Sequence, residues 1–472
     1  LATTKRHPSR VRHRTGLDAN GQLVAQDIEV LLDGGAYTTL SPVVLSRAII
    51  HAAGPYHCEN VRIRGRALFS NLPPFGAFRG FGAPQTQFAN ERHMDVVAQA
   101  IGVDPIELRR RNLIEEGQST ATGQVIADGA DRRRVLERAL ELATYGEKRQ
   151  AHREFNADHP YLRRGIGVAA VLHGAGFTGG GEVQLASRLH VAGLPDGAVE
   201  VRSAASEMGQ GVLTAHTKLA ADRLGIAPTF VRLAEPDTFR VPDSGPTVAS
   251  RSAMIVGRLI EDACDDLCKR LDLDADARGE TFQEALRTWH AAHPGEEIVG
   301  AAQYRRPKGM KWDEHAYRGD AYGTFAWSAN VAEVEVDLRT FNTRLLDFVA
   351  VQEVGKVLNE TIARGQIQGG VAQGIGWALL EECCWENGRL RNNQLANYIL
   401  PTSADTCPIR VEFHESAYEH GPQGAKGIGE LPINGPAPAI ANAVAVATGA
   451  CPTSIPLTPE RLMELLPHEQ AD

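Results

Sequence analysis

The chain of 472 residues is 43% hydrophobic and 23% charged, and its formal net charge is −9. This length exceeds what one compact core supports and predicts roughly two to four domains. So small a net charge excludes a strong overall electric field that would favour nucleic acid or an anionic membrane as a partner. No run of residues approaches the ~20 consecutive apolar positions that a transmembrane helix needs. We therefore expect a cytoplasmic chain that binds neither nucleic acid nor membrane.

The first half of the chain contains a predicted strand, a helix start and an internal boundary. Residues 22–32 have the pattern of a strand. Asp104 followed by Pro105 is typical of a helix N-cap with proline at the first helical position. The polar, charge-rich stretch between Asn112 and Arg164 separates two glycine-rich regions, and it predicts a domain boundary.

Two further strands are predicted in the second half. Residues 198–203 form one, and residues 332–338 alternate cleanly between apolar and acidic side chains. Val334 lies on the apolar side of this second strand and Glu333 on the other, which we expect to face water.

A helix is predicted over residues 255–271, where apolar residues recur every four positions. Residues 274–320 are polar and predict an excursion on the surface. Seven cysteines are scattered without a CxxC pair, which excludes a zinc ribbon or a ferredoxin-type cluster on this chain, and Cys264 and Cys268 favour buried thiols over a metal site. These elements together predict an α+β fold of mixed sheets with packed helices.

Small residues gather in five blocks, which is typical of places where the backbone approaches a partner closely. Three blocks run into helical patterns, and free amides at a helix start bind anions. Each block alone favours a tight turn, but five blocks with glutamine and serine beside the glycines indicate a large phosphate-bearing cofactor held from several sides. None matches a nucleotide-binding fingerprint. The blocks are residues 76–85, 207–211, 244–252, 365–374 and 424–430.

Five motifs in these blocks, taken in chain order, closely resemble the molybdenum-binding subunit of the xanthine dehydrogenase/aldehyde oxidase family of molybdenum hydroxylases. The motifs are GAFRGFGAPQ, EMGQG, SGPTVASRS, GQIQGGVAQGIG and KGIGELP. The resemblance implies that family's elongated α+β molybdopterin-binding architecture. Family subunits normally begin further upstream. Residues 1–115 are therefore expected to be the C-terminal part of the first molybdenum-cofactor-binding domain, 116–160 a connecting segment and 161–472 the second domain.

The resemblance assigns residues to catalysis and to the substrate. Glu430 in KGIGELP matches the glutamate that takes a proton during attack, and a carboxylate in an apolar, glycine-lined pocket is expected to have a raised pKa. Phe81 and Phe177 match the two phenylalanines that sandwich a planar substrate, and Thr178 is placed to bond a ring substituent. Arg47 matches the arginine that steadies charge on a purine oxygen, and it favours purines or related N-heterocycles over aldehydes.

The cofactor implied is a molybdenum–pterin, either molybdopterin or its cytosine dinucleotide, whose dithiolene holds the metal so that no protein side chain is a metal ligand. Ala249 is expected to face the metal's other ligands and Arg79 to brace neighbouring loops, while Arg251 is left to meet a phosphate or solvent. The residues matched to the cofactor site are Arg79, Gly209, Gln210, Ala249, Ser250, Ser252 and Gln373.

The expected partners are a [2Fe-2S] subunit, an FAD subunit, a subunit with the rest of the first molybdenum domain and a small aromatic substrate, in a higher oligomer such as a dimer of heteromers. The predicted reaction inserts water-derived oxygen at an electron-poor carbon of a purine-like or other aromatic N-heterocycle. Two alternatives stay open. One is an aldehyde oxidoreductase of the same family, and the other is a structural or assembly half-subunit without catalytic activity.

Overall fold

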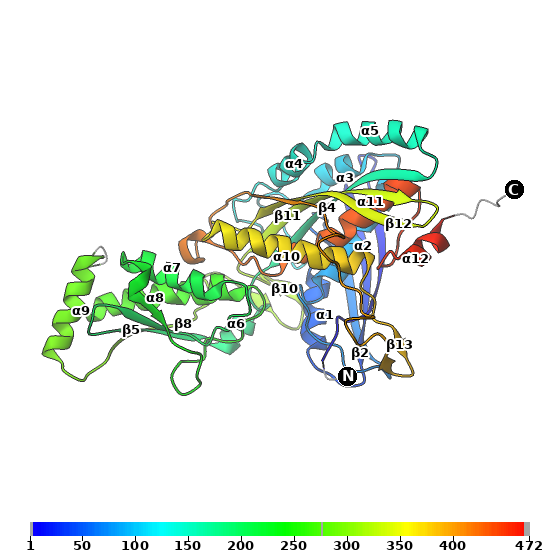
Figure 1. The fold of residues 1–472 in the computed structure, drawn as a ribbon. Coiled ribbons are helices and arrows are strands. Elements are labelled where there is room, and N and C mark those ends of the chain that lie inside the picture. The colour runs from blue at the N-terminus through cyan, green and yellow to red at the C-terminus, as the bar shows by residue number, and fades with distance from the viewer. Residues whose placement is uncertain (1–2, 275–276, 467–472) are drawn as a thin grey trace.

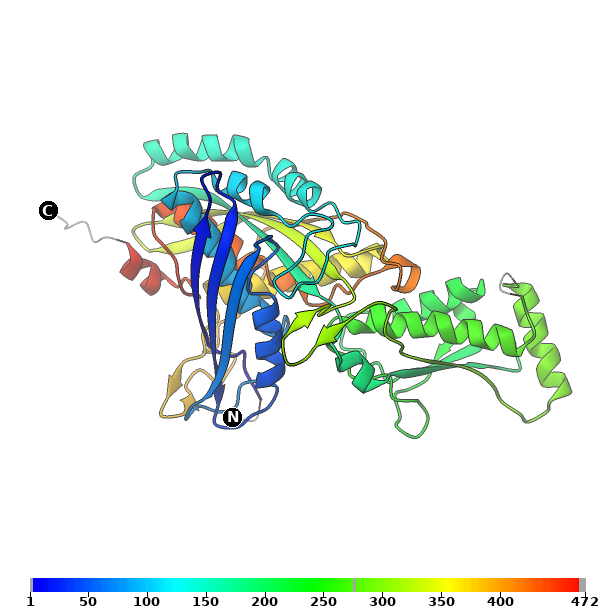
Figure 2. The same ribbon diagram turned by 180° about the vertical axis from the view of Figure 1, so that it is seen from behind.

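The structure is a computed structural model that describes residues 3–274 and 277–466. Two four-stranded sheets and one three-stranded sheet, each with helices packed against it, form an elongated body with a smaller lobe at one end (Figures 1 and 2). This arrangement confirms the predicted elongated α+β fold with mixed sheets. No helix among the described residues is both long and apolar enough to cross a bilayer.

The N-terminal sheet has the strand order β1-β2-β3, with β1 antiparallel and β3 parallel to β2. Ile28, Val30 and Leu32 of β2 are buried, which confirms the strand predicted over 22–32. Helices α1 and α2 cover the buried face. The elements are β1 (Ser9–Leu17), β2 (Leu23–Gly35), α1 (Ser41–Ile50), β3 (Asn60–Phe69) and α2 (Ala83–Ala100).

The central sheet has the order β15-β12-β11-β4 and lies between two helical layers (Figure 1). Helices α10 and α11 cover one face, and α4 and α5 cover the other. Helix α11 packs so closely that a Cβ at Gly167 of β4 would lie 2.2 Å from the amide nitrogen of Ala443. The elements are α4 (Arg132–Leu142), α5 (Tyr145–Asp158), β4 (Leu162–Gly174), β11 (Phe325–Asp337), β12 (Asn342–Glu353), α10 (Glu360–Leu379), β15 (Ile409–Phe413) and α11 (Pro436–Thr448).

The alternation predicted for residues 332–338 is present in β11, but its acidic face is not wet. Val334 and Val336 are fully buried, as expected. Helix α5 covers the other side, where Glu333 accepts hydrogen bonds from Lys148 (2.5 Å) and His152 (2.8 Å). Glu333 is therefore paired within the protein instead of being solvated, because a second helical layer covers this part of the face.

The smaller lobe has the strand order β7-β6-β5-β8, with α7, α8 and α9 packed against it. The helix predicted over 255–271 is present as a π-helical turn, Ser252–Val256, followed by α8. Residues 274–320 are not a simple surface excursion, because they contain α9 and β8, and residues 275–276 lie outside the described residues. The elements are α6 (Gly181–Leu185), β5 (Arg188–Gly193), β6 (Val199–Arg202), α7 (Val212–Leu224), β7 (Val231–Leu233), α8 (Gly257–Arg270), α9 (Glu280–Ala292) and β8 (Ile298–Gln303).

Shorter elements complete the chain. Asp104 caps α3 (Pro105–Asn112) by accepting hydrogen bonds from the amides of Ile106 and Glu107, as its sequence predicted. The division into domains at residues 115 and 160 stays a prediction. The remaining elements are β9 (Trp312–Asp313), β10 (Arg318–Gly319), β13 (Trp385–Glu386), β14 (Arg389–Leu390) and α12 (Pro459–Leu465), with 3-10 turns at Pro228–Phe230, Pro422–Gly424 and Leu431–Ile433.

Candidate functional site

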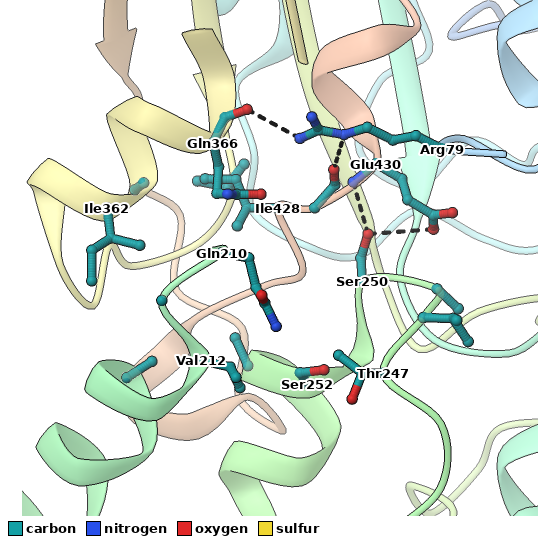
Figure 3. Close-up of a pocket in the computed structure, with 18 of the residues that line it drawn as sticks. Arg79, Gln210, Val212, Thr247, Ser250, Ser252, Ile362, Gln366, Ile428 and Glu430 are labelled. Carbon is teal, nitrogen blue, oxygen red and sulfur yellow. Dashed lines mark hydrogen bonds between the residues drawn. The ribbon is translucent and has the colours of Figure 1, made fainter. Parts of the chain in front are cut away.

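All five glycine-rich blocks meet at one cavity of about 640 Å³ between the central sheet and the smaller lobe. Figure 3 shows Arg79 and Gln366 on one side of this space and Gln210 and Ser252 on the other. Every residue that the sequence matched to the cofactor lines the cavity, as do Phe81 and Glu430. The lining segments are residues 77–81, 208–212, 247–253, 354–363 and 425–430, with Gln366 and Gln373 from α10.

Three residues that line the cavity have a left-handed backbone although none is glycine. They are Phe81 (φ 52°), Ala249 (φ 55°) and Ser250 (φ 55°). Such a conformation costs about 1 kcal/mol or more for each residue and persists only where the surrounding structure imposes it. This concentration of strain at one cavity is typical of a functional site.

The block at residues 207–211 does not present free amides at the start of α7. The Glu207 carboxylate accepts hydrogen bonds from the amides of Gly209 (2.8 Å), Gly211 (2.9 Å) and Leu213 (3.1 Å). The anion expected at this helix start is therefore supplied by the chain itself.

The block at residues 365–374 also differs from the predicted helix-start loop, because it lies inside α10. This helix begins at Glu360, and the Asn359 side chain caps it. Small residues in the middle of α10 instead allow close packing. A Cβ at Gly370 would lie 2.5 Å from Cβ of Pro432 and 3.1 Å from Cζ of Arg79.

Arg79 connects three segments around the cavity. Its Nε donates to the carbonyl of Gly429 (2.6 Å), Nη1 to Oε1 of Gln373 (3.1 Å) and Nη2 to the carbonyl of Gln366 (3.0 Å). Burial lowers the pKa of Arg79 to about 10, so the guanidinium remains charged at neutral pH. Its position fits the expected brace between loops.

Glu430 is buried in the cavity wall, and its two carboxylate oxygens differ in their contacts. Oε2 lies 3.3 Å from Nη1 of Arg47, 3.2 Å from Nε2 of His173 and 3.4 Å from Oγ of Ser250. Oε1 accepts a single hydrogen bond, from the amide of Gly80 at 3.3 Å. One oxygen is thus held by the protein, and the other keeps room for a further partner.

The pKa of Glu430 is lowered, which corrects the raised pKa expected from the sequence. Burial by itself would raise it, but the charge of Arg47 and the hydrogen bonds from His173 and Gly80 outweigh burial and bring the pKa to about 2. The sequence argument considered only the apolar, glycine-lined surroundings. The carboxylate is therefore ionised throughout the neutral range.

Arg47 is buried beside Glu430 and does not line the cavity itself. Its guanidinium donates to the carbonyls of Gly174 (2.9 Å) and Gly176 (2.5 Å), which lie at and just after the end of β4. Its Nε atom is buried and has no hydrogen-bond partner in the described chain. The Nε–H of Arg47 is therefore unpaired among the described residues, behind the wall of the cavity.

Phe177 and Thr178 lie in the loop that follows β4, outside the residues that line the cavity. Thr178 Oγ1 is 2.9 Å from the hydroxyl of Tyr322, and the amide of Phe177 donates to Oε1 of Glu182 (3.0 Å). Phe81, by contrast, lines the cavity, and its ring centre is 5.9 Å from Cζ of Arg47.

Several residues at the site gave no usable signal in the sequence. His173 contacts both Arg47 and Glu430, and Asn434 lies 3.1 Å from the other ring nitrogen of His173. Arg251 meets neither a phosphate nor solvent, because it is fully buried and pairs with Glu182 at 2.9 Å. These partners are far apart in the sequence, and spacing cannot reveal them.

No group of three or more His, Cys, Asp or Glu side chains within the described ranges is arranged to hold a metal ion. The cavity instead offers amide and hydroxyl groups. Its charged lining side chains are Arg79, Lys356, Lys426 and Glu430.

Comparison with known proteins identifies the two parts of the chain. Two related families, each described as molybdopterin cofactor-binding domain, match the chain. One matches residues 138–407 and the other residues 1–113. The chain is 30% identical to a probable xanthine dehydrogenase subunit from Bacillus subtilis, over 98% of this chain and 62% of that protein.

Two solved structures share the fold over nearly the whole chain. The aldehyde oxidoreductase from Desulfovibrio gigas superposes with a TM-score of 0.86 and 28% identity, over 98% of this chain and 49% of that one. Quinoline 2-oxidoreductase from Pseudomonas putida 86 gives a TM-score of 0.86 and 26% identity, over 99% of this chain and 63% of that one. The chain thus spans between about half and two thirds of the length of each of these three relatives.

Proposed function

Because the chain belongs to the molybdopterin-binding family that includes xanthine dehydrogenases and aldehyde oxidoreductases, we propose that it is the catalytic molybdenum-binding part of a hydroxylase. The proposed reaction inserts water-derived oxygen at an electron-poor carbon of a purine-like or other aromatic N-heterocycle. The observation that carries the proposal is the convergence of all five blocks on one cavity whose wall holds the buried carboxylate Glu430.

The cavity fits a pterin that carries phosphate. Its volume of about 640 Å³ lies within the range of small-molecule sites. Glutamine and serine side chains supply hydrogen-bond donors and acceptors for a polar heterocycle, and three of the four charged side chains that line the cavity are cations. Gln210, Ser250, Ser252 and Gln373 are proposed to hold the pterin, with Gly209 and Ala249 allowing close approach and Arg79 fixing the loops.

When bound, the cofactor supplies the transferred oxygen and accepts two electrons. This chain supplies the proton acceptor. Glu430 is ionised, and its Oε2 is held by Arg47, His173 and Ser250, so Oε1 is the atom proposed to take the proton. A positioned carboxylate of this kind contributes roughly 10²–10⁴-fold to rate.

Arg47 and the aromatic residues are proposed to bind the substrate. Arg47 lies behind the cavity wall, where its guanidinium is 3.3 Å from Glu430 and 5.9 Å from the ring centre of Phe81, and its charge is proposed to stabilise negative charge that develops on a purine oxygen. Phe81 provides one wall for a planar ring, while Phe177 and Thr178 are proposed to meet it from the loop after β4. This arginine supports the choice of a purine-like substrate.

The proposed partners carry the electrons away. We expect a [2Fe-2S] subunit and an FAD subunit in a higher oligomer, and this expectation is supported by the name of the Bacillus subtilis relative, which is itself a subunit. The form of the pterin, with or without its cytosine dinucleotide, is decided by mass analysis of the released cofactor.

Assays of the purified complex with hypoxanthine, xanthine, nicotinate and benzaldehyde test the proposal. Turnover of the heterocycles that is lost in E430Q would support it, and full activity of E430Q would exclude Glu430 as the base. The aldehyde alternative, to which the name of the Desulfovibrio gigas structure corresponds, predicts equal losses for purines and aldehydes in R47M. Absence of molybdenum and pterin from the complex would favour a structural half-subunit.

A further inference from the structure

The ion pair between Arg47 and Glu430 is less closely formed than the other fully buried arginine–glutamate pairs of the described residues. Arg109 places two guanidinium nitrogens at 3.0 and 2.9 Å from Glu91, and Arg251 places two at 3.0 and 2.9 Å from Glu182. Arg47 places one nitrogen at 3.3 Å from Glu430, although both side chains are more than nine-tenths buried. Since two opposite buried charges gain most from a two-nitrogen contact, something must hold this pair open.

His173 lies where the pair would otherwise close. Its Nε2 is 2.8 Å from Nη1 of Arg47 and 3.2 Å from Oε2 of Glu430. With its proton on Nε2, the imidazole donates to Glu430, and with its proton on Nδ1 it accepts from Arg47. In either tautomer it occupies one bonding position of the pair. The Asn434 amide donates to the carbonyl of Leu172 and lies 3.1 Å from Nδ1, so both ring nitrogens have a polar neighbour that holds the ring in place.

The backbone at the end of β4 holds the arginine in place on its other side. The carbonyls of Gly174 and Gly176 accept from Nη1 and Nη2. His51 joins the same two elements, because its Nδ1–H donates to the carbonyl of Arg47 (2.7 Å) and its Nε2 accepts from the amide of Gly174 (3.0 Å). Arg47 is therefore fixed by these bonds, and the pair can close only if Glu430 moves toward Arg47, into the position that the His173 imidazole fills.

We propose that His173 is a positioning residue that keeps the Arg47–Glu430 pair from closing. The open pair leaves Oε1 of Glu430 with a single hydrogen bond, from the amide of Gly80, so that this oxygen stays available on the cavity side. The charged or titratable groups that surround Glu430 are Arg47 of α1, His51 just after α1, His173 of β4, Tyr322 before β11, and Arg79 and Arg6 on the N-terminal side. The catalytic meaning of the open pair rests on the proposed function, whereas its geometry does not.

The test uses H173A in the holoenzyme, which empties the position of the imidazole, with H173L as a second variant if the smaller side chain destabilises the fold. Without the imidazole the pair closes, so kcat should fall about tenfold or more, because Glu430 is drawn toward Arg47 and away from the cavity. H173Q, whose amide can donate and accept, should recover most of the loss. H152A is the matched control, since His152 is a buried histidine that bonds Glu333 on the far side of the central sheet, and it should leave kcat unchanged.

A double-mutant cycle decides whether His173 acts through Arg47. In an R47M background, H173A should cause no further loss beyond about twofold, because there is no pair left to close. Losses that multiply in the double variant would overturn the proposal. A crystal structure of H173A should show two guanidinium nitrogens within about 3 Å of Glu430, and an unchanged single contact would also overturn it. If no substrate class is turned over, the proposed function fails, and the crystal structure of H173A still decides the role of His173.

Discussion

The lowered pKa of Glu430 makes the stability of this protein depend on pH in a way that E430Q should remove. The ordinary pKa of a glutamate is 4.5, and in the folded chain it is about 2. A carboxylate whose pKa is lower in the folded state stabilises the fold above its unfolded pKa, and this contribution is lost as the pH falls through the folded pKa. A gap of about 2.5 pH units corresponds to about 3 kcal/mol, of which about 2 kcal/mol is lost between pH 6 and pH 3.

The measurement compares the thermal and urea unfolding of the wild type and E430Q at several pH values between 6 and 3. The free energy of unfolding of the wild type relative to E430Q should decrease by about 2 kcal/mol over this range, because the glutamine cannot titrate. E261Q provides a control of opposite sign, since burial raises the pKa of Glu261 and its advantage over glutamine should grow as the pH falls. A difference for E430Q that is flat with pH, or that increases toward acid, would refute the assignment.

Packing, capping and charge around the cavity lead to four more expected outcomes. G370A should destabilise the chain by about 1–3 kcal/mol in thermal unfolding, because the new Cβ would clash with Pro432 and Arg79. G369A, on the open face of α10, should instead stabilise the chain by up to about 1 kcal/mol. R79M should lower the molybdenum content per chain severalfold in metal analysis, and the exposed-pair variant R339M should not. E207A should reduce stability by about 1 kcal/mol by removing the cap of α7, and an unchanged melting temperature would contradict it. A plot of kcat/KM against pH should show no loss of activity from protonation of Glu430 above about pH 4. A fall in kcat/KM near neutral pH that is present in the wild type and absent in E430Q would contradict the lowered pKa.

The sequence predicted the site well where the site is built from local backbone. All five small-residue blocks line one cavity, because close approach of backbone requires glycine and left-handed residues whatever the distant contacts are. The capping of α3 by Asp104 and the buried stripe of α8 were likewise predictable, since each depends on residues within one or two turns.

Other features could not be predicted because they depend on contacts between distant segments. Glu430 and Arg47 are 383 positions apart, and their pairing decides the sign of the pKa shift. Helix α9 was missed because its core contacts are made by only two fully buried residues, Phe282 and Leu286, within a polar stretch. The acidic side of β11 was expected to be wet because nothing in residues 332–338 indicates that α5 covers it.

The ion pair with Arg47 also bears on how a carboxylate with so low a pKa would act as the proposed base. Among the groups around Glu430, Arg47 lowers its pKa the most. Arg47 is also the group proposed to stabilise negative charge that develops on the substrate. Negative charge that develops on a substrate oxygen in the cavity would offset the field of the Arg47 guanidinium at Glu430. Burial then raises the pKa of Glu430 without the same opposition, and each unit of rise strengthens proton acceptance by about 1.4 kcal/mol. The carboxylate is thus weakly basic in the empty site and becomes more basic as the reaction proceeds, which is the direction that favours the transition state over the ground state.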